Sequence, residues 1–180
     1  MKMHISTLIT ALGLGVCFLN TAHAQFAGTG TTTVSVTVAA EASIEINTST
    51  TNLTSVGIFA NYTGTTNLTY KIRTTPSTGS GTITLKVTAD FLPANGPSVA
   101  TPPTGGDALA YTCTVSAPGT ACTGSQTSST TASTPVATFG GGANSAVAGN
   151  SGSVAWTLTN DPAYHTGSYS ATVTFTVSAT

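Results

Sequence analysis

Few residues in this chain are suited to acid–base chemistry. Asp161 and His165 lie in one loop, at residues 160–167, where a carboxylate could orient an imidazole toward a serine. Serines are abundant, and Asn160-Asp161-Pro162 is a common turn sequence, so this pattern has no specificity for a hydrolase. We therefore predict that the protein is not an enzyme.

A metal site would have to use the remaining acidic residues. Asp90 and Asp107 flank a stretch rich in Pro and Gly, and the two carboxylates could share a calcium ion with backbone carbonyls. The chain has no loop with the regularly spaced acidic residues of a calcium site, and His165 is the only histidine after residue 24. We predict no metal and no cofactor.

The first 24 residues have the features of a signal peptide. One lysine precedes a mostly apolar run at residues 8–19, and Ala22-His23-Ala24 supplies the small residues of a cleavage site. The apolar run is too short for a convincing membrane span, and no second hydrophobic segment follows. We expect cleavage after Ala24, and an exported chain at the cell surface or outside the cell with no membrane span.

The two cysteines beyond this leader are close in sequence. Cys113 and Cys122 flank the turn sequence Ala117-Pro118-Gly119, whereas Cys17 lies in the predicted leader. In an oxidising exported compartment such a pair forms a disulfide across its loop. We predict a Cys113–Cys122 disulfide.

The composition limits the partners of the chain. Charged residues make up only 5% of it, against about a quarter in typical proteins. Beyond the leader, three basic residues stand against five acidic ones, so nothing favours binding to a nucleic-acid backbone. A weakly charged surface rich in Thr and Ser also lacks the repulsion that keeps copies apart. Self-association is therefore the expected partnership.

Alternating apolar and polar residues predict a β protein. The alternation is clear at residues 68–72, 83–89, 154–158 and 169–179, and Pro- and Gly-rich turns separate these segments. No stretch has sustained helical periodicity. We predict an all-β immunoglobulin-like or jelly-roll sandwich at residues 48–180, with segments 123–134 and 140–152 as loops or weakly ordered connectors. The expected core residues are Ile72, Leu85, Val87, Phe91, Trp156 and Phe175.

The N-terminal segment at residues 25–47 contains an unusually long alternation. Every even-numbered residue from Val34 to Ile46 is small or apolar, and a strand of this length would span roughly 40 Å, about twice the usual length. Either the chain bends at residues 39–41 and serves two sheets of its own domain, or its first half pairs with another molecule. The candidate donor residues are Val34, Val36, Val38, Ala40, Ala42, Ile44 and Ile46.

The same segment lacks the residues that usually protect a sheet edge. No Lys, Arg or Pro occurs between residues 29 and 47, and Glu41 and Glu45 are its only charged residues. Residues 31–38 could therefore add a strand to the sheet of a neighbour. The weakly charged surface favours this assembly alternative over the bent strand.

Aromatic residues suggest a different function. Tyr62 and Tyr164 lie in turn-like surroundings and are the candidate contacts for a ligand, such as a cell-surface glycan. Tyr70, Tyr169 and Trp156 lie at alternating strand positions, where core packing or cross-strand pairing is more common.

The signal peptide, the alternating segment with Val34, Val36 and Val38, and the closing strand at residues 169–179 resemble exported bacterial sandwich proteins of the pilin and surface-layer kind. In chaperone-assembled pilins, such an N-terminal extension completes the fold of the next subunit. Those subunits commonly carry a tyrosine next to last, where this chain has Ala179. Trp156-Thr157-Leu158 and the segment up to Phe175 also resemble the end of WxL cell-wall-binding domains, although the second WxL motif has Trp where Phe175 stands.

Together these features predict a secreted structural subunit of an extracellular filament, pilus or surface layer that assembles by β-strand addition. The alternative is a monomeric adhesion or carbohydrate-binding sandwich that uses Tyr62 and Tyr164.

Overall fold

The computed structural model describes residues 29–180. Contacts between Cα atoms divide the chain into two units, Met1–Val36 and Thr37–Thr180, and all the strands of the described residues belong to the second unit. The signal peptide predicted at residues 1–24 lies outside the described residues.

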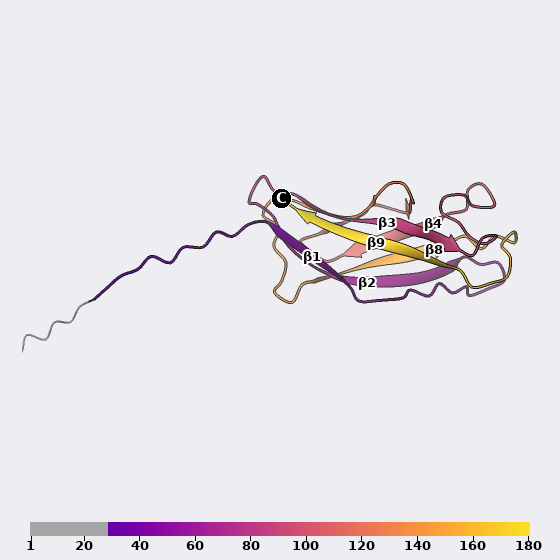
Figure 1. The fold of residues 1–180 in the computed structure, drawn as a ribbon, viewed down its shortest axis with the longest axis horizontal. Coiled ribbons are helices and arrows are strands. Elements are labelled where there is room, and N and C mark those ends of the chain that lie inside the picture. The colour runs from indigo at the N-terminus through magenta and orange to yellow at the C-terminus, as the bar shows by residue number, and fades with distance from the viewer. Residues whose placement is uncertain (1–28) are drawn as a thin grey trace, which may run out of the picture. The chain divides into compact units, whose positions relative to one another are not determined.

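The second unit is an all-β sandwich of two antiparallel sheets, as predicted (Figure 1). The five-stranded sheet has the order β1 (Glu41–Ile46), β2 (Tyr62–Arg73), β8 (Asn150–Leu158), β4 (Leu109–Val115) and β6 (Gln126–Thr127). The four-stranded sheet has the order β5 (Thr120–Ala121), β7 (Thr134–Phe139), β3 (Gly81–Leu92) and β9 (Ser170–Ala179).

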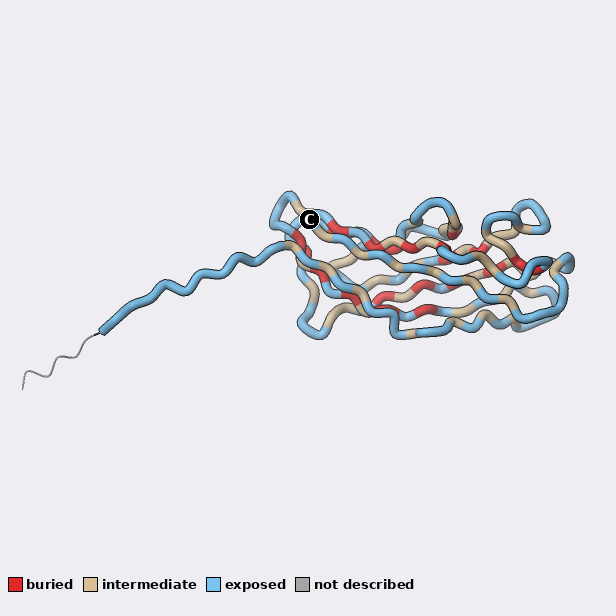
Figure 2. Tube along the Cα trace, in the orientation of Figure 1, coloured by how far each residue is buried: buried red, intermediate tan, exposed pale blue. Residues whose placement is uncertain are grey.

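The core lies between the sheets and consists of the apolar residues of the alternating strands. Figure 2 shows these buried residues in red along the middle of the sandwich. Of the predicted core residues, Ile72, Leu85, Val87 and Trp156 are buried, whereas Phe91 and Phe175 are only partly buried at its border.

Buried polar groups in the core are paired. The indole Nε1–H of Trp156 donates to Thr66 Oγ1 at 2.8 Å, and the Tyr111 hydroxyl donates to the carbonyl of Pro135 at 2.9 Å. The Tyr70 hydroxyl donates to the carbonyl of Ser116. Because a buried polar group without a partner is costly, these bonds allow the large aromatic side chains to lie between the sheets.

The predicted disulfide is present and joins the two sheets. Cys113 belongs to β4 in one sheet, and Cys122 directly follows β5 in the other, with 5.5 Å between their Cα atoms. The Cys122 backbone N–H also donates to the carbonyl of Val136 in β7 at 2.9 Å. This covalent link lies on the side of the sandwich where β4, β5, β6 and β7 meet, which we call the closed side.

The Ser- and Thr-rich segment at residues 123–134 is more integrated than a loose connector. It contains β6 and the buried Ser128, whose N–H donates to the carbonyl of Leu109 in one sheet. The carbonyl of Ser129 accepts from the N–H of Val87 in the other sheet. The segment therefore fastens the closed side through its backbone, and a count of apolar residues does not detect such bonds. In the second segment, residues 140–149 form the predicted loop and β8 begins at Asn150.

The strands define two ends of the sandwich. At the near end β1 begins, β2 ends at Arg73 and β9 ends at Ala179. At the far end β2 begins at Tyr62 and β9 begins at Ser170, and the loop at residues 55–60 is located there. Each strand thus has a known direction between the near end and the far end.

The predicted boundary between an N-terminal strand and the sandwich needs correction. The second half of the long alternation is β1, which pairs with β2 from Glu41↔Arg73 to Ile46↔Leu68, so the sandwich begins before residue 48. The first half does not switch to the other sheet, because neither sheet contains a described residue before Glu41. Because β1 pairs with β2, Ala42, Ile44 and Ile46 belong to their own sandwich and are not part of a donor strand.

Candidate functional site: two free strand edges and an exposed valine segment

The last strand of the sandwich has a long free edge. Along one side β9 pairs with β3, and on its other side no strand within residues 29–180 pairs with it. Its ten residues include no charged residue and no proline. Exposed edges usually carry such residues, or are kept very short, because free backbone N–H and C=O groups attract another strand. The β9 edge is ten residues long and has no charged residue and no proline, so it has neither form of protection.

The inward-facing row of β9 is only partly covered. No residue of β9 is buried, although alternate side chains pack against the core. In the adjacent strand β3, by contrast, Ile83, Leu85 and Val87 are fully buried. The half-covered row of β9 consists of Ala171, Val173, Phe175, Val177 and Ala179. The apolar interior is therefore incompletely covered at this edge.

The first strand forms the other border of the same side. Within the described chain β1 pairs only with β2, none of its residues is buried, and Ala42 and Ile44 are partly covered. Figure 1 shows the start of β1 beside the end of β9, and the two strands are in contact. We call this side, between the free edges of β1 and β9, the open side.

The segment before β1 presents the predicted donor valines to solvent. Val34, Val36 and Val38 are 89%, 84% and 61% exposed. Figure 2 shows their segment in the pale blue of exposed residues. Three large apolar side chains spaced two residues apart share one face of any strand that they form. A strand that covered the half-covered row of β9 would need this pattern of apolar residues on one face.

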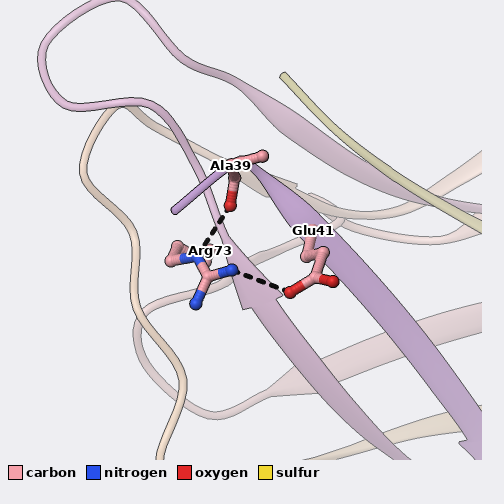
Figure 3. A network of polar contacts seen from close by, with 3 residues as sticks. All are labelled: Ala39, Glu41 and Arg73. Carbon is pink, nitrogen blue, oxygen red and sulfur yellow. Dashed lines mark hydrogen bonds and ion pairs between the residues drawn. The ribbon is translucent and has the colours of Figure 1, made fainter. Parts of the chain in front are cut away.

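Arg73 holds the point where the chain enters the sandwich (Figure 3). Its Nε–H donates to the carbonyl of Ala39 at 2.8 Å, and its Nη2 forms an ion pair with Glu41 Oε2 at 2.7 Å. Arg73 is the last residue of β2 and lies opposite Glu41 in the ladder. One side chain therefore fixes both Ala39 and the start of β1. The sequence alone does not indicate this role, because the partners are more than thirty residues apart.

The acid and histidine considered for catalysis have separate partners. Asp161 Oδ1 accepts from the N–H of Ala163 at 2.7 Å, while the His165 N–H donates to the carbonyl of Asn95 at 2.9 Å. The nearby Thr104 side chain, followed by the Ala163 N–H, lowers the pKa of Asp161. These contacts stabilise far-end loops and do not link Asp161 to the imidazole.

Asp90 and Asp107 also have separate surroundings. Asp90 accepts from the N–H groups of Val99 and Ala100 and from the hydroxyl of Ser98, at 2.8, 3.0 and 2.7 Å. Its oxygens are therefore used to hold the loop that follows β3. Among residues 29–180, no group of three or more His, Cys, Asp and Glu residues lies close enough to hold a metal ion.

Asp107 instead belongs to a small polar cluster with a candidate ligand residue. The Tyr164 hydroxyl donates to Asp107 Oδ2 at 3.0 Å. Burial and the nearby Asp161 raise the pKa of Asp107. Burial, and then the carboxylate of Asp107, raise the pKa of Tyr164 as well. This hydroxyl is thus already engaged within the protein.

The two candidate ligand tyrosines are partly buried. Tyr62 begins β2 and packs against the core, and Tyr164 lies in the loop after β8. Tyr62 lies opposite Leu158, the last residue of β8, so the fold places both tyrosines at the far end. Their aromatic faces are less available than those of fully exposed side chains.

Within residues 29–180, no helix has the length and apolar character needed to cross a lipid bilayer. No protein-family model, curated protein or solved structure matches this chain.

Proposed function

We propose that this chain is a non-enzymatic structural subunit that assembles outside the cell by β-strand addition. Residues 31–38 are the donor strand, and the open side of a second copy, along the free edge of β9, is the acceptor. Export through the leader expected at residues 1–24 would deliver the subunit to the cell surface. Repeated addition would build a filament or a surface layer.

The observation that carries this proposal is the match between an exposed segment and an incomplete sandwich. Val34, Val36 and Val38 are exposed and spaced as on one strand face, and the inward row of β9 is half-covered along an unprotected edge. Burial of each valine contributes about 1.5 to 2 kcal/mol, or about 5 kcal/mol for the three before the cost of ordering the segment. Backbone hydrogen bonds to β9 add direction and register.

The connection to β1 favours a donor in another copy over the same chain folding back. To reach its own β9 edge, the segment would have to reverse direction at Ala39 and Ala40, directly before β1. Only these two residues are available for the reversal, and neither is one of the usual turn residues Gly, Pro, Asn, Asp or Ser. The bond from Arg73 to the Ala39 carbonyl further restrains this reversal. A neighbour's sheet requires no such turn.

The experiment compares two pairs of substitutions that add the same charge to opposite faces of the donor. Val34→Asp with Val36→Asp places carboxylates on the valine face, and Ser35→Asp with Thr37→Asp places them on the polar face. Both variants and the unchanged exported chain are purified and inspected by electron microscopy and size measurement. We expect filaments or sheets from the unchanged chain and from the polar-face variant, and monomers from the valine-face variant.

Either of two results would contradict strand addition. If the unchanged chain remains monomeric at high concentration, or if the valine-face variant still forms polymers, strand addition through these residues is wrong. Glycan binding by a purely monomeric chain, lost on Tyr62→Ala or Tyr164→Ala, would instead support the adhesion alternative. The partial burial of both tyrosines and the engaged hydroxyl of Tyr164 make that alternative the less supported one.

A further inference from the structure

The far-end loop at residues 55–60 carries an exposed apolar cluster that the donor strand does not use. Val56 and Ile58 are each 95% exposed, and Phe59 is exposed beside them. Single exposed apolar residues are common, but three large ones within four positions of a short loop indicate a contact surface. We call Val56, Ile58 and Phe59 the loop cluster.

Hydrogen bonds hold this loop in one conformation. Ser55 Oγ lies 2.6 Å from the carbonyl oxygen of Ala60 and 2.9 Å from that of Gly57. Asn160 Nδ2 also donates to the Ala60 carbonyl at 3.0 Å, and a backbone bridge between Thr54 and Thr63 closes the base of the loop. A loop fixed in this way presents its apolar side chains without first having to be ordered, which lowers the cost of binding.

The near end carries a surface that combines apolar and polar residues. A hollow of about 320 Å³ is lined by apolar or small residues and by polar ones: Val38, Ala39, Ala40, Pro76 and Gly142, with Arg73, Thr74, Thr75 and Asn144. Nearby, Val147 in the loop before β8 is almost fully exposed and lines a second hollow beside β1. The linings of both hollows include Arg73, and the second also includes Glu41 and Lys71. We call the lining residues of these two hollows the near-end surface.

The direction of β9 determines which ends of two copies meet. β9 runs from the far end to the near end, so a donor antiparallel to it runs toward the far end of the acceptor. The near end of the donor copy then meets the far end of the acceptor copy. This arrangement is head-to-tail and can continue indefinitely. A parallel donor would bring near ends together, where the acceptor's own donor segment also leaves, and could not propagate in a line.

The short connection brings those two ends into contact. Only Ala39 and Ala40 separate Val38, the last donor valine, from Glu41, the first residue of β1. Three residue steps span at most about 11 Å even when fully extended. Arg73 also anchors the Ala39 carbonyl to its own sandwich, which shortens the usable reach.

From this geometry we infer that the loop cluster of one copy packs against the near-end surface of the next copy in the polymer. The occupant of the loop cluster is therefore a second copy of this chain. The contact rests on the proposed function, and it supplies a sandwich-to-sandwich interface in addition to the donor strand. It would limit bending between subunits and favour filaments of uniform width.

Cysteine cross-linking tests this contact in assembled polymers. The full exported chain is prepared with Ile58→Cys and Val147→Cys together, and it is treated with a short bismaleimide while the native disulfide is intact. The matched control pairs Ile58→Cys with Ala132→Cys, an exposed position in the loop between β6 and β7. We expect a ladder of covalent oligomers from the first pair, at least tenfold stronger than from the control.

Each other outcome has a clear meaning. Filaments that depend on Val34 and Val36 but give no ladder would overturn the loop contact and leave strand addition intact. Monomers from the unchanged chain would overturn both. A ladder that persists when Val34→Asp and Val36→Asp are added would overturn the strand-directed contact, because the ends would then meet without the donor.

A second variant tests the energy of the contact and a different occupant. Val56→Ser with Ile58→Ser should leave the unfolding midpoint of the monomer unchanged and raise the concentration for half-maximal assembly about tenfold. If assembly is unchanged and the substitutions instead abolish binding to vesicles of phosphatidylcholine and phosphatidylglycerol, the loop cluster is a membrane contact and the inference is wrong.

Discussion

The closed and open sides of the sandwich cover the same apolar interior to different extents. On the closed side, the edge strands β5 and β6 have two residues each, and a disulfide and the backbone of Ser128 and Ser129 fasten the two sheets together. On the open side, β9 is ten residues long, β1 and β9 contain no buried residue, and the described chain offers no strand to the β9 edge.

We propose that this difference separates folding from assembly. Short edges and cross-links protect the closed side from unwanted strand pairing, as is usual in β proteins. The open side has neither protection, and the same chain carries three exposed valines of suitable spacing. Under the proposed function, the closed side would keep the subunit folded while the open side waits for the donor strand of a neighbour.

The largest expected effect comes from removing a matched phenylalanine on each side. Phe139 in β7 is buried and contacts the Tyr70 ring, with 5.1 Å between ring centroids, whereas Phe175 in β9 is only partly covered. Phe139→Ala should cost about 3 to 5 kcal/mol of unfolding free energy, and Phe175→Ala roughly half as much in a monomer. Urea unfolding followed by Trp156 fluorescence measures both.

The monomeric background for this comparison is the variant with Val34→Asp and Val36→Asp. In polymers of the unchanged donor, the cost of Phe175→Ala should rise, because the proposed donor strand would cover that side chain. Equal losses for the two phenylalanines in the monomer would mean that the open side is already complete.

The next largest effect tests the covalent fastening of the closed side. Cys113→Ala with Cys122→Ala opens a loop with a sequence separation of nine, which the chain-entropy model values at about 2.5 to 3 kcal/mol. Thermal unfolding should shift downward, while polymers should still form below the new midpoint because the open side is unchanged. An unaltered midpoint would show that backbone bonds alone hold the closed side.

A smaller effect is expected at Asp90, which belongs to neither side. Burial alone would raise the pKa of Asp90, but hydrogen bonds from Val99, Ala100, Ser98 and Phe91 outweigh it and hold the pKa below its ordinary value. Its stabilisation is present above the ordinary aspartate pKa of about 3.9, and it is lost as the pH falls through the lowered pKa of the folded state.

Asp90→Asn should therefore cost about 1 to 2 kcal/mol at pH 7, and the variant and unchanged proteins should converge in acid. Urea unfolding at a series of pH values measures this difference. A pH-independent difference would contradict an ionised Asp90 as the cause. Assembly should not change in either case.

The smallest effect concerns the anchor of the open side. The side chains of Arg73 and Glu41 are both largely exposed, so Arg73→Ala should change the unfolding free energy by less than about 1 kcal/mol. Any electrostatic part should shrink as salt is added. Arg73→Lys is the control that keeps the charge without the planar guanidinium. A large loss that does not depend on salt would point to the bond with the Ala39 carbonyl.

Much of the fold could be predicted because its central strands alternate so regularly. The predicted segments at residues 68–72, 83–89, 154–158 and 169–179 correspond to β2, β3, β8 and β9. Four other strands were not predicted, β4 to β7. Pro135 interrupts the pattern of β7, and β5 and β6 are too short to show a period. Packing against longer neighbours creates these strands.

The candidate site was predictable only in its donor half. The exposed valines have a visible period, but alternation is the same in an edge strand and a central one, so β9 could not be recognised as an open edge from its residues. For the same reason Ala42, Ile44 and Ile46 were grouped with the donor, whereas pairing with β2 places them in the sandwich. Strand order is a property of distant pairings.

The sequence by itself determined the period-two strands, the low charge and the nearness of the two cysteines, because these depend on neighbouring residues. Only the tertiary structure decided which strands lie at the edges, which side the disulfide closes, and that the loop at residues 55–60 and the start of β1 lie at opposite ends. Those outcomes depend on contacts between residues far apart in the chain, and local residue patterns do not encode them.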